Sequence, residues 1–273
     1  MQSSRLTLMA FFAHPDDEAF GTGGTLAKYA AEGCDVYLVT ATRGEAGEIA
    51  VPDLTTPADL PHVREQELRC ACEIYGIHPP RFLDYPDGLL PIIHQGQAVA
   101  KLVRIIRELK PQVLITFGAD GIYGHYDHIA VHRWATIAFD LAADPGCFPN
   151  QLEGSCEVHQ VSKLYYRVLS EDRLKAMSEE GERPSVMMDG VPFSIVGRPD
   201  DEITTVVDVS DHVEAKLQGL RCHVSQIGYD IPFSESPDEV LAESWFRQET
   251  FALGRSAVGW PEGVETDLFS GLR

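Results

Sequence analysis

The sequence predicts an α/β protein with a Rossmann-like three-layer fold, in which helices cover both faces of a mostly parallel sheet. Two observations favour this fold class. Apolar runs of strand length alternate with segments of helical periodicity as far as residue 142. The strand-like runs are apolar throughout, as strands buried on both faces must be. A smaller C-terminal α+β region is expected after this core.

Residues 6–13 form the first expected strand, because the run is continuously apolar. The glycine-rich turn at 21–24 then opens a helix that ends before Gly33, a typical helix stop. A second buried strand is expected over 35–42. A strand, a helix and a strand in this order make a βαβ unit, so the two strands should be parallel with a right-handed crossover.

Residues 43–61 are rich in Gly, Glu, Thr and Pro, which predicts a long loop of the kind that often carries function. Helical periodicity and apolar runs continue the alternation beyond it. The expected elements are helices over 62–75, 97–109 and 128–142, strands over 81–83 and 113–117, and a loop over 118–127.

The pattern is less regular after residue 150. The expected elements there are strands over 163–169 and 203–209 and helices over 213–223 and 239–253. We expect residues 1–145 to form the Rossmann-like core that binds a metal. Residues 146–273 are expected to be an extension that completes the same domain and the substrate pocket.

Composition limits the class of partner. The 273 residues carry a net charge of −20, with 44% hydrophobic and 23% charged residues, which is ordinary for a globular protein apart from its acidity. Nucleic acid is an unexpected partner, because phosphate binding needs clustered Lys and Arg. A small molecule is the expected partner, and the sequence leaves a homo-oligomer open.

The sequence predicts a cytoplasmic location without membrane attachment. No apolar run approaches the roughly 20 residues that span a membrane, and the N-terminus lacks a signal-peptide pattern. The cysteines contain no CxxC pair, so we expect reduced structural thiols. They are Cys34, Cys70, Cys72, Cys147, Cys156 and Cys222.

The first candidate site is the segment His14-Pro15-Asp16-Asp17-Glu18, directly after the first strand. Ligands gather where parallel strands end. His14 and Asp17, three residues apart, could meet one divalent ion, and a mixed His/Asp set suits zinc, iron(II) or another first-row metal. Asp16 could then take a proton from a water at the metal. The alternative is that Asp16 or Asp17 caps the following helix.

The second candidate site follows the strand at 113–117. Here His125 and His128 repeat the three-residue spacing, and Asp127 could brace one imidazole. His132 is an alternative ligand, since it lies one helical turn beyond His128. Three protein ligands leave a coordination position open, as in catalytic zinc sites. A protonated His125 or the Tyr123 hydroxyl could stabilise the oxyanion formed when water attacks an amide.

These two segments resemble the PIG-L or LmbE-like family of zinc-dependent sugar N-deacetylases, which includes the deacetylases of mycothiol and bacillithiol biosynthesis. The similarity rests on residues 13–18 and 124–128 and is extended by three shorter segments. These are Thr42 to Glu48, Arg64 to Glu67, and Glu265 to Phe269 near the C-terminus.

The resemblance implies a role for each matching residue. The zinc ligands would be His14, Asp17 and His128. The catalytic residues would be Asp16 as general base, His125 as acid and oxyanion stabiliser, Asp127 orienting His125, and Tyr123 polarising the carbonyl. The sugar would contact Arg64, Asp87 and Glu48. Tyr126 replaces the usual proline of the second motif, and residues 84–88 differ from the mycothiol enzymes, which affects the substrate assignment.

The predicted function is therefore removal of an acetyl group from an N-acetylated amino sugar, such as a GlcNAc conjugate, by metal-activated water. One alternative is an amidase acting on another acylated amine, such as a mycothiol S-conjugate. The other is a non-catalytic carbohydrate-binding protein that keeps the metal for structure. Asp16 and His125 argue against the second alternative, because a structural metal needs neither a base nor an oxyanion donor.

Overall fold

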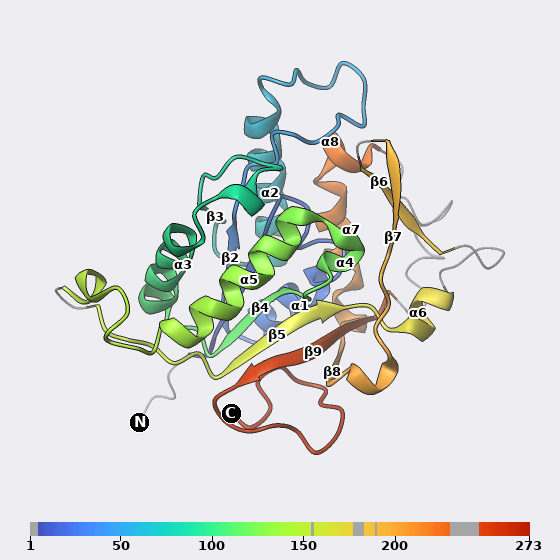
Figure 1. Cartoon of the computed structure of the whole chain (residues 1–273). Helices are drawn as coiled ribbons and strands as arrows, with labels where there is room; N and C mark the ends of the chain where they lie inside the picture. Colours follow the sequence, from blue (N-terminus) through green and yellow to red (C-terminus); the bar gives the residue numbers. More distant parts are fainter. Residues whose placement is uncertain (1–4, 154–155, 177–182, 189, 230–245) are drawn as a thin grey trace. The chain divides into compact units, whose positions relative to one another are not determined.

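A computed structural model describes residues 5–153, 156–176, 183–188, 190–229 and 246–273 (Figure 1). The fold is α/β, and its mostly parallel sheet has seven strands, as the sequence predicts. The chain forms two compact units. Unit 1 contains residues 1–90 and 207–249, and unit 2 contains residues 91–206 and 250–273.

Unit 1 is built on three parallel strands in the order β3-β2-β1. Its strands are β1 (Thr7–Phe12), β2 (Asp35–Thr40) and β3 (Arg81–Phe82). Its helices are α1 (Gly23–Ala31), α2 (Leu60–Tyr75), α7 (Val213–Arg221), α8 (Val224–Ile227) and the 3-10 turn η4 (Ser210–His212). All six residues of β1 are buried, so this strand is the centre of the unit's core.

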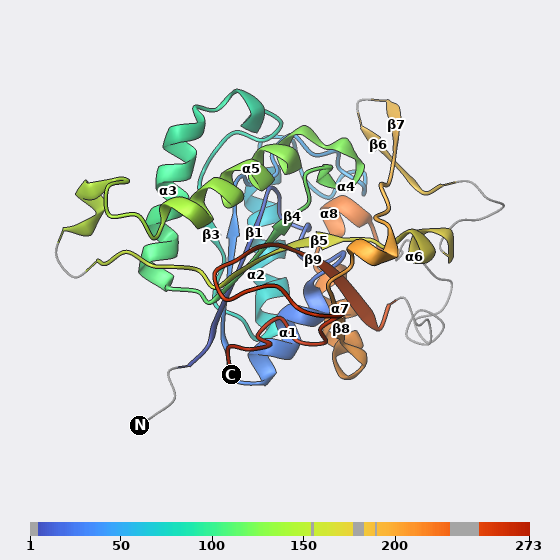
Figure 2. The same cartoon turned by 60° about the horizontal axis from the view of Figure 1, so that its bottom comes forward.

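Helices α1, α2 and α7 pack together (Figure 2). The ring of Tyr75, on α2, is buried among them. A Cβ at Gly23 or at Gly219 would meet this ring. Glycine at these two positions therefore allows the close approach of the three helices, of which α2 carries the candidate site residue Arg64.

Unit 2 contains the parallel pair β4 (Val113–Phe117) and β5 (Lys163–Val168), and β9 (Gln248–Ser256) runs antiparallel to β5. Helices α3 (Gln95–Leu109) and α5 (Tyr126–Leu141) lie side by side in both views (Figure 1, Figure 2). The hairpin strands are β6 (Ser185–Met188) and β7 (Val191–Ser194). The shorter helices are α4 (Gly121–Gly124), α6 (Glu171–Ala176), η2 (Pro149–Leu152) and η3 (Asp200–Glu202).

Two strands and one turn contain residues of both units. They are β8 (Thr205–Asp208), β9 and the 3-10 turn η1 (Leu90–Ile92). The division expected between residues 145 and 146 falls inside unit 2 and stays a prediction.

The structure confirms the predicted alternation through residue 142, with small shifts at helix starts. Helix α2 begins at Leu60, with Pro61 in its first turn, where a missing N–H has no cost. Helix α5 begins at Tyr126 because His125 caps it, with Nδ1 accepting a hydrogen bond from the Asp127 N–H at 3.2 Å. The predicted loop at 118–127 therefore contains the short turn α4 and the start of α5.

The helix predicted over residues 239–253 is wrong for residues 246–253, the part of the range that the structure describes. Residues 248–253 belong to β9 and pair with β5, for example Phe251 with Arg167. Phe251 and Leu253 are two residues apart and both buried, as the period of a strand allows. Pairing with a distant strand decided the conformation, and local periodicity did not contain that information. Residues 239–245 lie outside the described part.

The expectation of reduced cysteines is wrong for one pair. Cys70 and Cys222 form a disulfide, with their Cα atoms 6.0 Å apart and a separation of 152 positions in the sequence. The bond joins α2 to the residue after α7, two helices that pack against each other. The other four cysteines are thiols.

Candidate active site

His14 follows β1 and lies between two carboxylates of unit 1. Its backbone N–H donates to Oδ2 of Asp17 at 2.7 Å, and its Nδ1 lies 3.4 Å from the same oxygen. Its Nε2 lies 2.9 Å from Oδ1 of Asp87. The predicted ligands His14 and Asp17 are thus adjacent and buried, and both offer atom types that bind zinc.

Asp87, predicted to contact the sugar, is held in place by the loop that follows β2. Its Oδ2 accepts from the Ala46 N–H at 2.9 Å, and its N–H donates to Oε1 of Glu45 at 3.0 Å. Burial opposes ionisation, but the hydrogen bond and charge of His14 outweigh it and lower the pKa of Asp87 to about 2. Asp87 is therefore a carboxylate that braces His14, a role that the sequence analysis did not assign to it.

Asp16 has the chemistry of a general base. Burial raises its pKa to about 6, and the nearby Arg64 guanidinium is the strongest opposing influence. A base is most effective when its pKa lies near the working pH. The backbone of Asp16 has a φ of 109°, a conformation that residues with a side chain rarely adopt. Such outliers often occur at functional sites.

Arg64, the second predicted sugar contact, reaches Asp16 from α2. Its Nη2 donates to Oδ2 of Asp16 at 3.1 Å and to the Pro15 carbonyl at 2.5 Å. Its Nη1 donates to the Gly44 carbonyl at 2.7 Å. A Cβ at Gly44 would meet the guanidinium, so glycine is needed for this approach. Arg64 is buried and orders the loop around Asp16.

Glu48, the third predicted sugar contact, is exposed in the long loop between β2 and α2. Its carbonyl accepts from Nε2 of Gln226 at 3.1 Å, which ties the loop to α8. Its carboxylate is thus on the surface of the loop, whereas the Asp16, Asp87 and His14 side chains are largely buried.

In unit 2 the turn α4 holds Tyr123 in a strained segment. Ile122 has a φ of 71°, which is an outlier for a β-branched residue. Oδ1 of Asp120 accepts from the Ile122 N–H at 2.7 Å, and Oδ2 of Asp120 accepts from Nη2 of Arg198 at 2.5 Å. These bonds fix the turn that leads from β4 to Tyr123.

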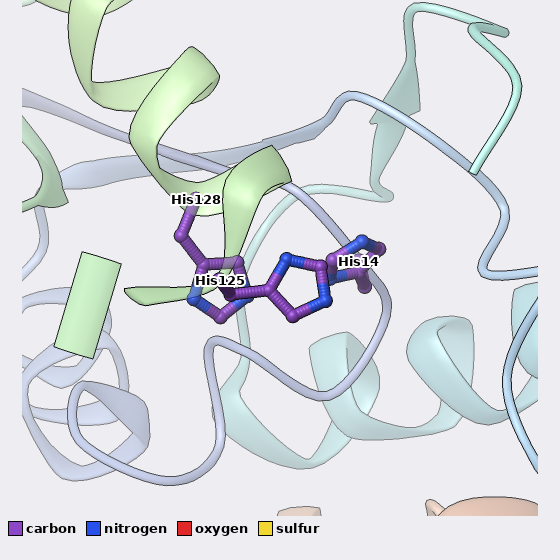
Figure 3. A group of neighbouring side chains, drawn as sticks. All are labelled: His14, His125 and His128. Atoms are coloured by element: carbon purple, nitrogen blue, oxygen red, sulfur yellow. The ribbon is translucent and has the colours of Figure 1, made fainter. Parts of the chain in front are cut away.

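His125 and His128 have their ring orientations set by hydrogen bonds (Figure 3). Because Nδ1 of His125 accepts from the Asp127 N–H, the proton of the neutral ring is on Nε2. Nδ1 of His128 lies 3.1 Å from the Gly121 carbonyl. A carbonyl only accepts, so His128 donates from Nδ1, which leaves the lone pair of the neutral ring on Nε2. This is the usual arrangement of a histidine that binds metal.

The aromatic rings around these histidines form one packed group. The His125 and His128 rings stack with centroids 4.5 Å apart, and the His128 ring stacks on Phe117 at 3.9 Å. Tyr123 meets His125 and His128 edge-on at 5.7 and 5.5 Å. Unit 2 thus brings together Tyr123, His125 and His128 as the sequence predicts. The hydrogen bond from Asp127 to His125 comes from its backbone.

His132, the alternative ligand, has a different environment. Its Nδ1 lies 3.0 Å from the Phe117 carbonyl, and its ring lies 4.7 Å from the Tyr166 ring. Burial lowers its pKa. Among the described residues it belongs to neither group of side chains that could hold a metal ion.

The protein has two candidate groups of metal ligands within the described ranges. One is His14, His125 and His128, which Figure 3 labels, and the other is His14, Asp87 and Asp127. Imidazole nitrogens and carboxylate oxygens suit zinc and other first-row divalent ions. Asp17 is in neither group.

Sequence reasoning did not pair Glu18 with His223, and the structure links both residues to Asp16. Oε2 of Glu18 accepts from the Asp16 N–H at 3.0 Å, and Oε1 of Glu18 lies 2.7 Å from Nε2 of His223. Glu18 could have been found as the last residue of the first motif. His223 is 205 residues further along the chain, so no local spacing could pair the two.

Comparison with known proteins adds the relationship. The family described as PIG-L, GlcNAc-PI de-N-acetylase, matches residues 9–139. A 1D-myo-inositol 2-acetamido-2-deoxy-alpha-D-glucopyranoside deacetylase from a Nocardioides species is 39% identical over 301 residues, which cover 97% of this chain and 98% of that protein.

Two solved structures show the same fold at low identity. N,N'-diacetylchitobiose deacetylase from Pyrococcus horikoshii has 19% identity and a TM-score of 0.67, covering 92% of this chain and 84% of that one. A 4-carboxy-2-hydroxymuconate hydratase from Pseudomonas putida has 17% identity and a TM-score of 0.65, covering 94% and 99%. The fold therefore supports more than one reaction. The relative at 39% identity over nearly the whole chain shows that this protein belongs to the PIG-L family of deacetylases.

Proposed function

We propose that this chain is a metal-dependent N-deacetylase of an inositol-linked N-acetylglucosamine, the substrate in the name of its 39% identical relative. The observation that carries the proposal is Asp16. Its carboxylate belongs to the residue between two predicted metal ligands in the chain and accepts a hydrogen bond from Arg64 at 3.1 Å. Burial raises its pKa to about 6, and a general base is most effective when its pKa lies near the working pH.

We assign His14, Asp17 and His128 as the ligands of a zinc ion, with iron(II) or another first-row ion as the alternative. Two observations support this set. His128 carries its proton on Nδ1, which leaves the Nε2 lone pair for a metal, and the His14 ring contacts carboxylates. His125, or Asp87 with Asp127, would replace members of the set if a candidate group without Asp17 binds the ion. A bound zinc ion supplies Lewis-acid activation of water and of the amide carbonyl.

The protein's own residues then divide the proton transfers. Asp16 takes the proton of the attacking water. His125, in its protonated form, donates from Nε2 to the developing oxyanion and afterwards gives this proton to the leaving amine. In the neutral ring, Nδ1 accepts from the Asp127 N–H, which sets the orientation of the imidazole. When His125 is protonated, Nδ1 is itself a donor and this hydrogen bond is released. The Tyr123 hydroxyl donates a second hydrogen bond to the carbonyl oxygen.

We propose that Arg64, Asp87 and Glu48 help to bind the sugar. Asp87 and Arg64 also contact His14 and Asp16, so a sugar hydroxyl bound by either residue would lie near the reacting amide. Exposed Glu48 would meet the part of the substrate that is further from the metal.

Acetate release with measured metal content tests this proposal. The purified protein, loaded with zinc, is incubated separately with GlcNAc-inositol, with GlcNAc and with a mycothiol S-conjugate. We expect the fastest release from GlcNAc-inositol. Faster cleavage of the S-conjugate would favour the alternative amidase. Binding of GlcNAc-inositol without hydrolysis of any amide would favour the carbohydrate-binding alternative.

We also propose a cytoplasmic protein that binds neither nucleic acid nor membrane. No helix in the described ranges is long and apolar enough to cross a bilayer. Disulfides are uncommon in the cytosol. The Cys70–Cys222 bond therefore argues against a cytoplasmic location, and the location needs an experimental test. Fractionation of cells, followed by thiol alkylation and mass spectrometry, would give both the location and the fraction of the bond that is oxidised.

A further inference from the structure

Glu18 and His223 form a buried pair behind Asp16, entirely within unit 1. The two side chains are 1% and 0% exposed, and Oε1 of Glu18 lies 2.7 Å from Nε2 of His223. Within the described residues, Nδ1 of His223 has no hydrogen-bond partner. Among the described residues, Glu18 is therefore the hydrogen-bond partner of the His223 ring. Burying such a pair costs desolvation energy, so a stability role alone is a weak explanation for it.

The second oxygen of Glu18 is the link to the predicted base. Oε2 of Glu18 accepts from the Asp16 N–H at 3.0 Å, while Oε1 is occupied by His223. The bonded amide belongs to the residue with a φ of 109°. A side chain that holds this N–H keeps Asp16 in a conformation that the chain would otherwise leave.

Helix α2 contacts both Asp16 and the segment that carries His223. From one side Arg64 donates to the Asp16 carboxylate at 3.1 Å. On the other side, Glu67 accepts from the N–H and hydroxyl of Ser225 at 2.7 and 2.6 Å, and Cys70 is bonded to Cys222. These contacts fix residues 222–225, which present His223 to Glu18. Helix α2 thus contacts Asp16 directly through Arg64. It also contacts Asp16 indirectly, through the segment 222–225, His223 and Glu18.

From this geometry we propose that Glu18 and His223 are positioning residues for Asp16, a role that rests on the proposed function. Glu18 holds the backbone N–H of Asp16, and His223 holds the carboxylate of Glu18. Arg64 holds the side-chain carboxylate of Asp16. Neither Glu18 nor His223 contacts substrate in this role. Their loss should slow the chemical step without weakening substrate binding, because a small misplacement of a catalytic group costs turnover.

Kinetics of His223→Ala, His223→Gln and Glu18→Gln, compared with wild type, test the proposal. We expect His223→Ala to lower kcat by about 10- to 100-fold with KM and zinc content unchanged. Gln at residue 223 can still donate to Glu18, and we expect it to restore most of kcat. In Glu18→Gln one oxygen can still accept from the Asp16 N–H, so the loss should be smaller than in His223→Ala.

Lys216→Met is the matched control, because Lys216 and Glu249 form another buried pair in unit 1, 3.0 Å apart and 2% and 0% exposed. It should lower stability and leave kcat per folded molecule unchanged. An equal loss of kcat in Lys216→Met, or a normal kcat in His223→Ala, would overturn the proposal. If His223→Ala does not fold, His223→Leu decides, because Leu fills the space but cannot donate to Glu18: a wild-type kcat per folded molecule in this variant would overturn the proposal.

Amide hydrogen exchange in the metal-free protein gives a readout that does not depend on activity. The Asp16 N–H should exchange at least about tenfold faster in His223→Ala than in wild type, and Lys216→Met should leave it unchanged. Unaltered exchange in His223→Ala would sink the positioning role. If wild type releases acetate from no amide, the proposed function fails, and the exchange result alone decides whether Glu18 and His223 hold Asp16.

Discussion

The two halves of the candidate site are held by different forces. In unit 1, Asp16 and His14 lie among charged side chains, and their partners Arg64, Glu18 and Asp87 come from several parts of the chain. In unit 2, Tyr123, His125 and His128 are oriented by backbone groups within a few residues and by stacked rings. The first half therefore depends on charged contacts, several of them between residues far apart in the sequence, and the second depends mainly on local structure.

Each half nevertheless contains a residue with a strained, positive φ next to a candidate site residue. Asp16 has a φ of 109° and Ile122 a φ of 71°. Each such outlier costs about 1–3 kcal/mol and persists only when its surroundings hold it. A buried carboxylate, Glu18, holds Asp16, whereas a partly exposed carboxylate, Asp120, holds Ile122. The comparison predicts that changes in unit 1 have larger effects than changes of the same kind in unit 2.

The largest expected effect is on turnover in Asp16→Asn. Asn tolerates the positive φ better than most residues, so the change removes the base and leaves the loop shape. We expect acetate release to fall by about 10²- to 10⁴-fold, the usual contribution of a general base. Zinc content, measured on the same sample, should stay unchanged. Turnover within threefold of wild type would show that another group takes the proton.

His128→Ala tests unit 2 directly. Loss of a ligand should release the metal, which elemental analysis of the dialysed protein would measure. His132→Ala is the matched control, because His132 is one turn further along α5 and bonded to the Phe117 carbonyl. Metal retained in His128→Ala but lost in His132→Ala would mean that the ligand assignment is reversed.

These assignments separate what the sequence can predict from what it cannot. The strands β1 and β4 and the motifs after them are continuous in sequence, so the apolar runs and the spacing of His14, His125 and His128 identified them. The family match explains why several roles could be assigned by position.

Pairings across the whole chain had no such signal. His223 meets Glu18 across 205 residues, and Cys222 meets Cys70 across 152. The sequence predicts a helix over residues 239–253, but residues 248–253 belong to β9, whose conformation depends on pairing with β5. Each of these contacts brings together residues that only the folded chain makes neighbours, so composition and periodicity could not predict them.

Acid should weaken unit 1 through Glu249. This buried carboxylate accepts from the Gly24 and Thr25 N–H groups at the start of α1 and pairs with Lys216. Burial raises its pKa, but Lys216 and Thr25 outweigh this, and the pKa in the folded protein is lower than the ordinary 4.5. The stabilisation is therefore complete above about pH 4.5 and is lost as the pH falls through the folded value.

Glu249→Gln should lower the free energy of unfolding by about 3–5 kcal/mol at pH 7, because it leaves Lys216 buried without its partner. Urea denaturation at several pH values measures the difference from wild type, which should shrink below pH 4.5. The double variant with Lys216→Met removes both charges and should recover part of the loss. A difference that grows in acid would contradict the lowered pKa.

Asp120 provides the smallest and most selective test of the comparison. Asp120→Ala removes the acceptor of the Ile122 N–H and the partner of Arg198, and a lost cap of this kind costs about 0.5–2 kcal/mol. Asp120→Asn keeps the acceptor and loses only the charge. The Arg198 side chain is 31% exposed, so the ion pair should contribute less than about 1 kcal/mol.

Thermal unfolding and kcat of both variants would then separate the contribution of the hydrogen bond from that of the charge. If unit 2 depends on local hydrogen bonds, Asn should behave almost like Asp, whereas a loss in Asn as large as in Ala would mean that charge holds this half as well.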